Sequence, residues 1–492
     1  MRRPMPIFYN ALMLTGVNLL LRFAGTAFQV FISGQIGAAG VGLLQLVLSV
    51  GSLSMTAGIA GIRTATMYLT AEELGKNRPG NVTWVLSGCF LYSILCSGAV
   101  GILLYIFAPT IAQSWVGDIQ TVYAIRLLAV FLPVSCLTGV MTGYFIAANR
   151  VGTLAAVEVA EQLCSMAVTA SALVFWADSD PGKACQAVVL GSCAGALLTL
   201  SCLVMLRLRE RHIPAKPIPI ASRLADTAIP LALADDLKAG ISTTENLMVP
   251  KRLALHTPNS LALFGTVCGM VFPVLMFPAA ILFGLTELLI PEMARCNAAG
   301  SRRRITYLTK RSLRLAMIYG TLSGGILYLA APELCMALYG SADAGTYLRW
   351  FAPLTVMIYC DIVTDAMIKG LGQQKASVRY SILTSAMDVV FLFILLPKYG
   401  IGGYFASFLV THVVNFGLSL RKLLKITHRH IPLHVPFLTI LCAVAAVGLS
   451  SVVPSPLLRC TAFAVILFCL LYLLRIVGKE DIHWLNGLIR KK

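Results

Sequence analysis

Long apolar segments recur along the entire chain, and short polar or basic stretches separate them. An apolar segment of about 20 residues can cross the hydrocarbon core of a bilayer as an α-helix. These segments predict fourteen helices, at residues 7–33, 41–71, 82–108, 119–147, 153–177, 183–206, 224–251, 261–291, 306–330, 346–370, 376–397, 401–424, 434–453 and 457–477. The pattern therefore predicts an all-α, polytopic membrane protein with about 14 transmembrane helices.

Composition agrees with this class and excludes an ordinary soluble globular protein. The 492 residues are 58% hydrophobic and 12% charged, whereas a soluble globular protein carries about 25% charged residues. The 14 cysteines lack CxxC spacing and fall mostly in apolar segments, so we interpret them as small packing residues. His428, His430 and His434 cluster without a cysteine or an acidic residue beside them, so no metal site and no cofactor are predicted.

The net charge of +18 comes from 39 Lys and Arg residues against 21 Asp and Glu residues. With the N-terminus in the cytoplasm, 29 of the cations fall on cytoplasmic ends and loops, 7 on the outer side and 3 inside helices. This distribution follows the positive-inside rule, so the surplus charge is expected to face membrane lipids rather than nucleic acid. Both termini are predicted to be cytoplasmic, and no cleavable signal peptide is expected.

The longest basic, Pro-containing connection suggests the domain organisation. Residues 207–223 separate an N-terminal six-helix lobe, 1–206, from a C-terminal six-helix lobe, 224–424. A weak echo between Phe131-Leu132-Pro133 and Phe351-Ala352-Pro353 fits parallel repeats around a central cavity. Residues 425–492 add two helices and a basic tail. Two interpretations of these helices stay open: a simple anchor, or a groove for the hydrocarbon tail of a substrate.

Three predicted helices carry polar residues at helical spacing, so each set shares one helix face. The sets are Asn18, Arg22, Thr26, Gln29 and Ser33; Gln45, Ser49, Ser52, Thr56 and Arg63; and Asp235, Lys238, Ser242, Glu245 and Arg252. Charged residues inside a membrane are costly and mark functional sites by default. We interpret the stripes as the wall of a water-filled cavity, and Arg as a group that grips phosphate bidentately. Pairing within helix 7, Lys238 with Asp235 and Glu245 with Arg252, is the alternative for those residues.

Acidic residues are concentrated in the second lobe. Asp361 and Asp388, together with Asp235, are candidates for ion or proton coupling, or for salt bridges. Asp365 and Lys369 have the spacing of an i,i+4 ion pair. No phosphate-binding loop of the GxxxxGK[ST] type and no catalytic motif occurs in the sequence. The sequence therefore predicts a protein that is not an enzyme and does not hydrolyse ATP. A gradient, the membrane potential or consumption of the product outside must then supply the energy.

Two short segments resemble a known family. Residues 37–46 (GAAGVGLLQL) resemble the turn that opens helix 2 in the stage V sporulation protein B family. Residues 249–253 (VPKRL) are similar to that family's Val-Pro-basic-basic-Leu segment. The resemblance covers about residues 5–480 and includes the fourteen-helix plan. This family belongs to the multidrug/oligosaccharidyl-lipid/polysaccharide (MOP) exporter superfamily, together with bacterial lipid II flippases.

The resemblance implies a V-shaped pair of lobes that works by alternating access in the bacterial plasma membrane. The cargo would be an undecaprenyl-pyrophosphate-linked glycan, such as a peptidoglycan or polysaccharide precursor. In related flippases arginines on helices 1, 2 and 8 line the cavity, and Arg22 and Arg63 match the first two. Predicted helix 8 has no central Arg here, and the nearest cations are Lys251 and Arg252. The family also favours the groove interpretation of the last two helices.

Two other functions stay open on the sequence. A cation-coupled multidrug exporter would use an acid-lined cavity, and the acids of the second lobe are compatible with one. A non-transporting membrane scaffold for envelope or spore assembly is the other alternative. A scaffold has no need of buried cations, so charge-removing changes at Arg22 and Arg63 would separate it from a flippase.

Overall fold

The computed structural model describes residues 5–59, 61–76, 78, 80–177, 180–209, 220–427, 434–474 and 476, and every regular element among them is helical. Ten of the described helices are long and apolar enough to cross a membrane, and the bent pair Ser260–Met276 and Ala279–Ala298 gives an eleventh. The chain is thus an all-α polytopic membrane protein, as predicted. His428 and His430 lie outside the described residues, and no metal-binding cluster occurs among the described ones. None of the 14 cysteines forms a disulfide.

The helices divide into two compact units. Unit 1 comprises Met1–Gly269 and Val389–Ile401, and unit 2 comprises Met270–Asp388 and Gly402–Lys492. The chain thus leaves unit 1 after the predicted linker 207–223, inside predicted helix 8. Unit 1 contains α1 Met5–Ile59, α2 Ile62–Gly75, α3 Asn81–Ile111, the π-helical η1 Ala112–Val116, the 3₁₀ turn η2 Ile119–Thr121, α4 Val122–Ala147, α5 Val151–Phe175, α6 Pro181–Leu208, α7 Ala221–Leu253 and α8 Ser260–Phe264.

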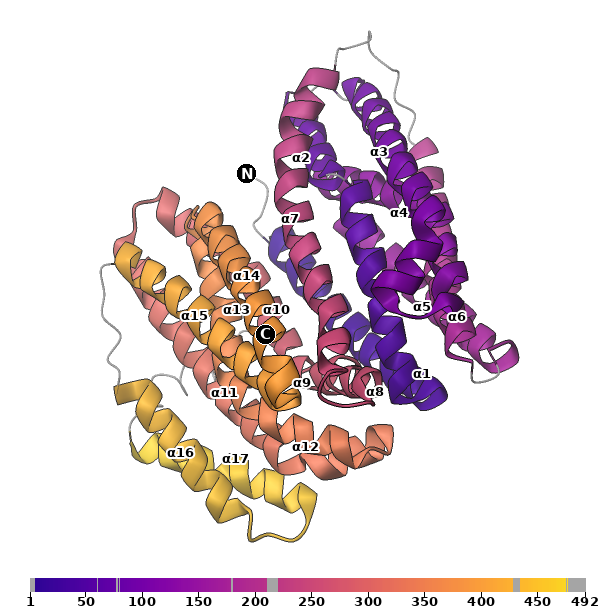
Figure 1. Ribbon diagram of the computed structural model, residues 1–492. Coiled ribbons are helices and arrows are strands. Elements are labelled where there is room, and N and C mark those ends of the chain that lie inside the picture. The colour runs from indigo at the N-terminus through magenta and orange to yellow at the C-terminus, as the bar shows by residue number, and fades with distance from the viewer. Residues whose placement is uncertain are drawn as a thin grey trace. The chain divides into compact units, whose positions relative to one another are not determined.

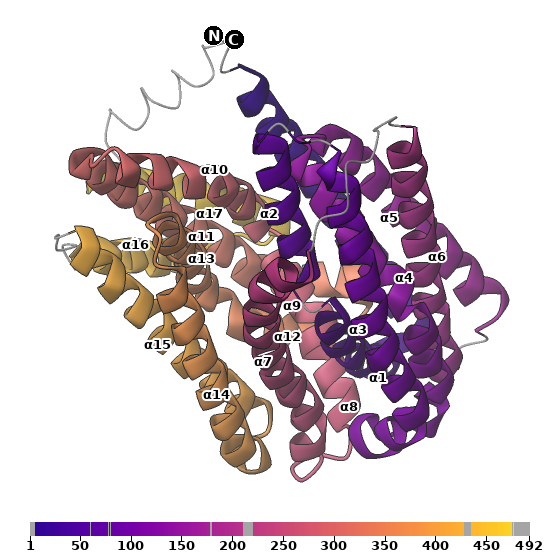
Figure 2. The ribbon, with the colours of Figure 1, turned by 90° about the horizontal axis from the view of Figure 1, so that it is seen from above.

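Unit 2 begins within the π-helical segment η3 Gly265–Val271. It continues through α9 Phe272–Met276, α10 Ala279–Ala298, α11 Arg302–Tyr339, α12 Ala342–Phe351, the 3₁₀ turn η4 Ala352–Leu354, α13 Thr355–Gly370, most of α14 Gln374–Tyr399, α15 Ile401–Thr427, α16 His434–Ser450 and α17 Pro456–Leu473. Figures 1 and 2 both show α16 and α17 beside α11.

Several predicted helices are interrupted, and glycine or proline accounts for each break. Predicted helix 2 follows a kink at Gly37 (φ 68°, ψ 177°) and breaks again at Gly61 (φ 72°), backbone conformations that side chains other than glycine rarely allow. Predicted helix 8 bends by 59° beside Pro278, which has no N–H to donate. Predicted helix 10 passes through the 3₁₀ turn that contains Pro353.

Close helix packing in unit 1 depends on small residues. A Cβ atom on Gly42 of α1 would lie 2.3 Å from the carbonyl oxygen of Leu261, and one on Gly265 would lie 1.9 Å from that of Ala38. Hydrophobic burial gives no driving force between helices that lie in lipid, so such close backbone approach supplies van der Waals contact instead. The start of predicted helix 8 is fixed against α1 in this way.

An ion-pair network joins α7 to α2 at the end that the charge distribution predicts to be cytoplasmic. Arg223 donates from Nη2 to Glu72 Oε2 (2.6 Å) and from Nη1 to Glu73 Oε1 (3.1 Å). Asn81 Nδ2 donates to the second oxygen of Glu73 (2.9 Å), and the Glu73 side chain is only 4% exposed. Ile220, Leu224 and other buried side chains continue this contact into the core of unit 1. The helix that follows the linker is thus anchored to α2.

In unit 2, α16 and α17 pack on α11. Phe463 of α17 is fully buried, and a Cβ on Gly325 of α11 would lie 2.0 Å from the Phe463 ring. The ring therefore occupies the space that a side chain at position 325 would need. Arg459, at the start of α17, donates from Nη1 to Glu333 of α11 (3.3 Å) and from Nε to the carbonyl of Val453. These contacts fix the terminal helix pair against unit 2.

Candidate functional site

Arg63 lies at the break between α1 and α2. It is the second residue of α2, and its side chain is exposed. A Cβ on Gly143 of α4 would lie 2.5 Å from the Arg63 carbonyl oxygen, so α4 packs directly on this turn of backbone. A guanidinium beside the start of a helix is a favourable environment for an anion, because the first N–H groups of the helix also carry partial positive charge.

Acidic residues of α5 face the same region, and they were missed from the sequence. Glu158 is half-buried and interacts electrostatically with both Arg63 and Glu161. Glu161 accepts a hydrogen bond from Thr199 Oγ1 of α6 (2.7 Å). Two carboxylates at i,i+3 within an apolar helix are a signal of a functional site that the sequence contains, and the interpretation based on three polar stripes did not include it. The region is therefore of mixed charge rather than purely cationic.

The polar face of α1 adds to this region in part. Arg22 is exposed, and its carbonyl accepts a hydrogen bond from Thr26 Oγ1 (2.9 Å). Gln162 of α5 faces this part of α1, with Nε2 3.8 Å from the position of a Cβ on Gly25. Gln29 Nε2 instead donates to the carbonyl of Gly269 (3.3 Å), and thereby links α1 to η3. The side chain of Asn18 lies outside the described part of the structure.

Predicted helices 2 and 7 contact each other at Ser49. Thr243 Oγ1 donates to the Ser49 carbonyl (3.2 Å), and Asn246 Nδ2 donates to Ser49 Oγ (3.1 Å). Ser49 Oγ in turn donates to the carbonyl of Gln45 (2.8 Å). Ser52 is exposed. At this level the stripe of predicted helix 2 therefore serves partly as hydrogen-bonded helix packing, which is the ordinary use of Ser, Thr and Asn in membranes, and its partners Thr243 and Asn246 lie outside the predicted stripe of helix 7.

The charged residues of α7 divide into two groups. Asp235 and Lys238 are exposed one turn apart, and Glu245 is half-buried. Arg252 stacks on Phe393, with its guanidinium carbon 3.3 Å from the ring centroid, and Lys251 Nζ donates to the carbonyl of Ser114. The two cations that the family resemblance singles out near helix 8 therefore make packing contacts within unit 1.

In unit 2, the carboxylates of Asp361 and Asp388 lie in a hydrogen-bonded polar cluster of α13, α14 and α15. Asn415 Nδ2 donates to Asp361 Oδ2 (2.8 Å), while Asp361 Oδ1 is buried without a hydrogen-bond partner among the described residues. Asp388 is 7% exposed and accepts hydrogen bonds from Ser407 Oγ and from Thr411 Oγ1 (3.4 Å). The partners on α15 come from a different predicted helix, so the sequence alone did not associate them.

The i,i+4 pair predicted on α13 is confirmed, because Lys369 Nζ lies 2.6 Å from Asp365 Oδ2. This pair accounts for Asp365 as an ordinary salt bridge. A buried carboxylate oxygen without a partner is costly, since the charge has no compensating donor. Asp361 is therefore the acid of unit 2 that most resembles a site for a proton or a small cation.

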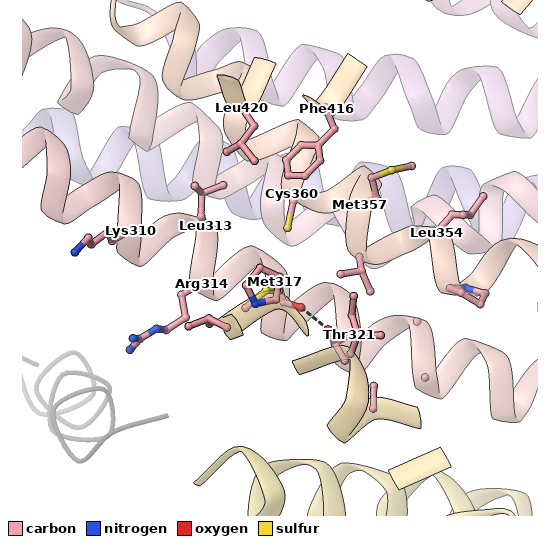
Figure 3. Close-up of a pocket in the computed structure, with 18 of the residues that line it drawn as sticks. Lys310, Leu313, Arg314, Met317, Thr321, Leu354, Met357, Cys360, Phe416 and Leu420 are labelled. Atoms are coloured by element: carbon pink, nitrogen blue, oxygen red, sulfur yellow. Dashed lines mark hydrogen bonds between the residues drawn. The ribbon is translucent and has the colours of Figure 1, made fainter. Parts of the chain in front are cut away.

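A groove of about 770 Å³ runs between α11, α13, α15 and α16 of unit 2, and we call it the α11–α16 groove. Figure 3 shows Met317, Leu354, Met357, Phe416 and Leu420 around it. Its lining on α11 follows one helical stripe, from Thr306 and Lys310 at one end to Gly325 and Tyr328 at the other. At a rise of 1.5 Å per residue this stripe is about 33 Å long, close to the thickness of a hydrocarbon core.

Charge among the described lining residues is confined to one end of this groove. Among the described lining residues the charged ones are Lys310 and Arg314, one turn apart at the predicted cytoplasmic end of α11. At the opposite end Tyr328 also lines a second pocket of about 510 Å³, together with Pro332, Met336, Ala342, Thr346, Arg349 and Trp350. The two cavities thus share Tyr328 in their lining, and the charged residue of the second pocket is Arg349.

Comparison with known proteins places this fold. The family model described as MatE matches residues 14–171. Stage V sporulation protein B of Bacillus subtilis (strain 168) is 22% identical over 409 residues, which cover 80% of this chain and 78% of that protein. The chain is therefore similar to the MatE family over residues 14–171 and to stage V sporulation protein B over most of its length.

Solved structures agree with this assignment at the level of fold. An inward-facing multidrug resistance MATE family transporter of the MOP superfamily superposes with a TM-score of 0.68, at 14% identity, over 85% of this chain and all of that one. The lipid II flippase MurJ, in an inward closed conformation, superposes with a TM-score of 0.66, at 11% identity, over 97% of this chain and all of that one. These two structures share the fold of this chain, and the resemblance predicted from residues 37–46 and 249–253 is confirmed by the similarity to stage V sporulation protein B.

Proposed function

We propose that the chain is a flippase that moves an undecaprenyl-pyrophosphate-linked glycan across the bacterial plasma membrane by alternating access. The glycan would be a peptidoglycan or polysaccharide precursor, used in cell-wall or spore-envelope synthesis. Both termini would be cytoplasmic, as the positive-inside distribution predicts. Transport would run from inside to outside, because such precursors are made in the cytoplasm and consumed outside.

The α11–α16 groove is the observation that carries this proposal. A drug-sized cation needs a compact pocket, whereas this groove is mostly apolar and follows α11 for about the full hydrocarbon thickness. Such a shape suits a long hydrocarbon chain. Val435, Ala443 and Val447 of α16 form one wall, which supports the groove interpretation of the terminal helix pair over a simple anchor.

The exposed guanidinium groups of Arg22 and Arg63 would bind the pyrophosphate. An Arg keeps its charge when desolvated and presents paired N–H donors that match phosphate oxygens. Lys238, Gln29, Gln45, Ser52, Glu245, Arg252 and Asn18 remain proposed cavity residues of lesser weight, because the described contacts of Gln29 and Arg252 are packing contacts. Glu158 would act as a counter-charge that the pyrophosphate must compete with.

Asp361 and Asp388 would couple transport to a gradient of protons or small cations, with Asp235 as a further candidate. The unpartnered oxygen of Asp361 supports this role, because protonation or a cation would compensate it. The same cluster keeps the second candidate function, cation-coupled drug export, in consideration. Under that function Asp361 would be essential and Arg22 and Arg63 dispensable.

Binding of undecaprenyl-pyrophosphate lipids to the purified chain, measured by native mass spectrometry, tests the proposal. The comparison is between wild type, Arg22→Gln, Arg63→Gln and the control Lys398→Gln, which removes an exposed cation at the end of α14. Selective binding that both Arg variants lose and the control retains would support the flippase. Binding equal to that of phosphatidylglycerol and unchanged in every variant would overturn it, and would favour the exporter or the scaffold.

A further inference from the structure

A histidine lies inside the membrane-spanning part of unit 2, beside the polar cluster of Asp361 and Asp388. His412 is half-buried near the middle of α15, and it interacts electrostatically with Asp388, which lies near the middle of α14. An ionisable residue this deep in a membrane helix marks a functional site by default. A positive charge on the imidazole would need a negative partner there, and the carboxylate of Asp388 supplies one.

Acidic groups lie on two of the helices around this ring, and uncharged rings lie on two others. From α14 the described charged neighbour is Asp388. From α13, Asp361 joins the same cluster through its hydrogen bond with Asn415 of α15. From α9 and α12, the rings of Phe272 and Phe351 contact this part of α15 and carry no charge. The surroundings of the histidine therefore favour a cation over an anion.

The hydrogen bond of the ring determines which of its nitrogens can take a proton. His412 Nδ1 lies 3.0 Å from the carbonyl oxygen of Phe408. A carbonyl oxygen only accepts, so Nδ1 carries the hydrogen of this bond, and the lone pair of the neutral ring is on Nε2. A proton therefore binds at Nε2, and the bond from Nδ1 is kept in both states. Proton uptake changes the charge of the ring without requiring it to turn.

The same ring is the end of an aromatic stack. The ring centroids of His412 and Phe408 are 3.9 Å apart, with an interplanar angle of 27°. Phe408 in turn stacks on Phe272 of α9, at 5.2 Å and 28°. We call these three rings the aromatic stack. The face of a phenyl ring is electronegative and attracts a cation, so a charged imidazole should hold Phe408 more tightly than a neutral one.

The far end of the aromatic stack is a short helix that side chains hold in place. α9 lies between the π-helical η3 and the 59° bend of predicted helix 8. Tyr359 Oη donates to the carbonyl of Leu275 (2.9 Å), and Tyr319 Oη donates to that of Pro278 (2.8 Å). These bonds fix the end of α9 that is next to the bend. The other end begins with Phe272, so a change of charge in the aromatic stack acts on the first residue of α9.

We propose that His412 binds the proton that drives transport, and that the aromatic stack transmits its charge to α9. This inference rests on the proposed coupling of transport to a gradient, and it names the coupling ion as the proton. Asp388 is then the counter-charge of the protonated ring. One proton binds at Nε2 on the side of higher proton concentration and leaves from Nε2 on the other. Hard metal cations prefer oxygen ligands, so a site on an imidazole nitrogen selects the proton over them.

Hydrogen exchange of α9, measured on the full chain in nanodiscs without cargo, tests the aromatic stack. Exchange of residues 272–276 is compared at about pH 5 and about pH 8, the range in which histidine titrates, after correction for the intrinsic pH dependence of exchange. We expect opening of α9 to be about threefold rarer at the lower pH in the wild type. His412→Gln and Phe408→Leu should each lose this response.

A matched control separates the aromatic stack from a general loss of folding. Phe405→Leu removes a phenyl ring from the same helix, and the ring contacts of Phe405 are with α12. This variant should keep the pH response. Equal loss of the response in Phe405→Leu and Phe408→Leu would overturn the role of the aromatic stack. A response that survives in His412→Gln and disappears in Asp388→Asn would assign the proton to the carboxylate and overturn the inference.

Transport in proteoliposomes tests the identity of the coupling ion. The cargo is a dye-labelled undecaprenyl-pyrophosphate disaccharide, and either a proton gradient or a sodium gradient of equal size is imposed. The proton gradient should accelerate transport, the sodium gradient should not, and His412→Gln should lose the acceleration. Acceleration by sodium alone, or acceleration that His412→Gln retains, would overturn the inference.

Failure of this inference can be distinguished from failure of the proposed function. If the wild type moves no polyprenyl cargo, the proposed function fails, and the pH response of residues 272–276 still decides the role of His412. If the cargo is moved but neither transport nor α9 responds to pH, this inference fails and the proposed function stands.

Discussion

The ion-pair network of Arg223 allows burial and distance to be set against each other as predictors of interaction strength. Arg223 contacts two carboxylates, and the shorter contact, 2.6 Å, is to Glu72, whose side chain is 29% exposed. The longer contact, 3.1 Å, is to Glu73, which is 4% exposed. If distance decided the energy, Glu72 would contribute more to stability. If burial decided it, Glu73 would.

We expect burial, rather than distance, to determine which of the two ion pairs contributes more to stability. A hydrogen bond to a charged group that is shielded from water contributes about 1.5–3 kcal/mol, whereas exposed ion pairs contribute far less. Because Arg223 is itself 35% exposed, solvent screening places the Arg223–Glu73 coupling near the lower limit, at about 1.5 kcal/mol. The Arg223–Glu72 coupling should be the smaller of the two in spite of its shorter distance.

Double-mutant cycles measure both couplings. The single variants Arg223→Gln, Glu73→Gln and Glu72→Gln and the two double variants are unfolded in mixed micelles of SDS and a non-ionic detergent. The free energy of unfolding is followed by tryptophan fluorescence. A Glu73 coupling below about 0.5 kcal/mol, the usual scatter for independent sites, would refute the reasoning, as would a Glu72 coupling equal to it. Adding salt should reduce the Glu72 coupling more than the Glu73 coupling.

Three further outcomes are expected. Gly42→Ala should destabilise the protein by about 3 kcal/mol, because its Cβ would meet a backbone oxygen at 2.3 Å. Gly34→Ala, which has open space around it within α1, should not destabilise the protein in the same thermal unfolding assay. Arg63→Gln should lower the affinity for pyrophosphate lipids by about threefold. Glu158→Gln should raise that affinity by about threefold, because the carboxylate competes with the pyrophosphate for the guanidinium. Shifts of the same sign in the two variants would contradict this expectation. Asp388→Asn should uncouple transport from an imposed ion or proton gradient in proteoliposomes while cargo binding is retained, and unaltered gradient dependence would exclude the role.

Periodicity and length were sufficient to predict most of the helices. A membrane span must form its backbone hydrogen bonds internally and expose apolar side chains to lipid, so it is visible in the sequence as a long apolar segment. The break at Gly61 was not predicted, because it depends on a single residue in the left-handed region. Pro278 is visible in the sequence as a residue that kinks a helix, but the bend of predicted helix 8 depends on how this proline and a π-helical segment combine. Such local geometry leaves the hydrophobic pattern almost unchanged.

The candidate site residues that lie on one helix could be predicted from the sequence, whereas contacts between residues of different helices could not. Arg22 and Arg63 follow from the cost of charge inside a membrane, as does the ion pair of Asp365 with Lys369. The pairing of Asp361 with Asn415 joins two helices that are distant in sequence, and the groove depends on which face of α16 meets α11. Tertiary packing determines which of these residues meet, and the contacts between distant helices cannot be predicted from a single sequence.

The composition of unit 1 has a consequence for the order of events during synthesis. Residues 389–401 belong to this unit: Phe393 lies under the Arg252 guanidinium, and Gly400 lies against the ring of His256. The ribosome must therefore translate about 120 residues beyond Gly269 before these contacts can form, an interval on the order of ten seconds. Through that interval the far end of α7 stays uncovered, so unit 1 is completed only after residues 270–388 of unit 2 have been synthesised, and a nascent chain that stops short of residue 389 retains an incomplete bundle.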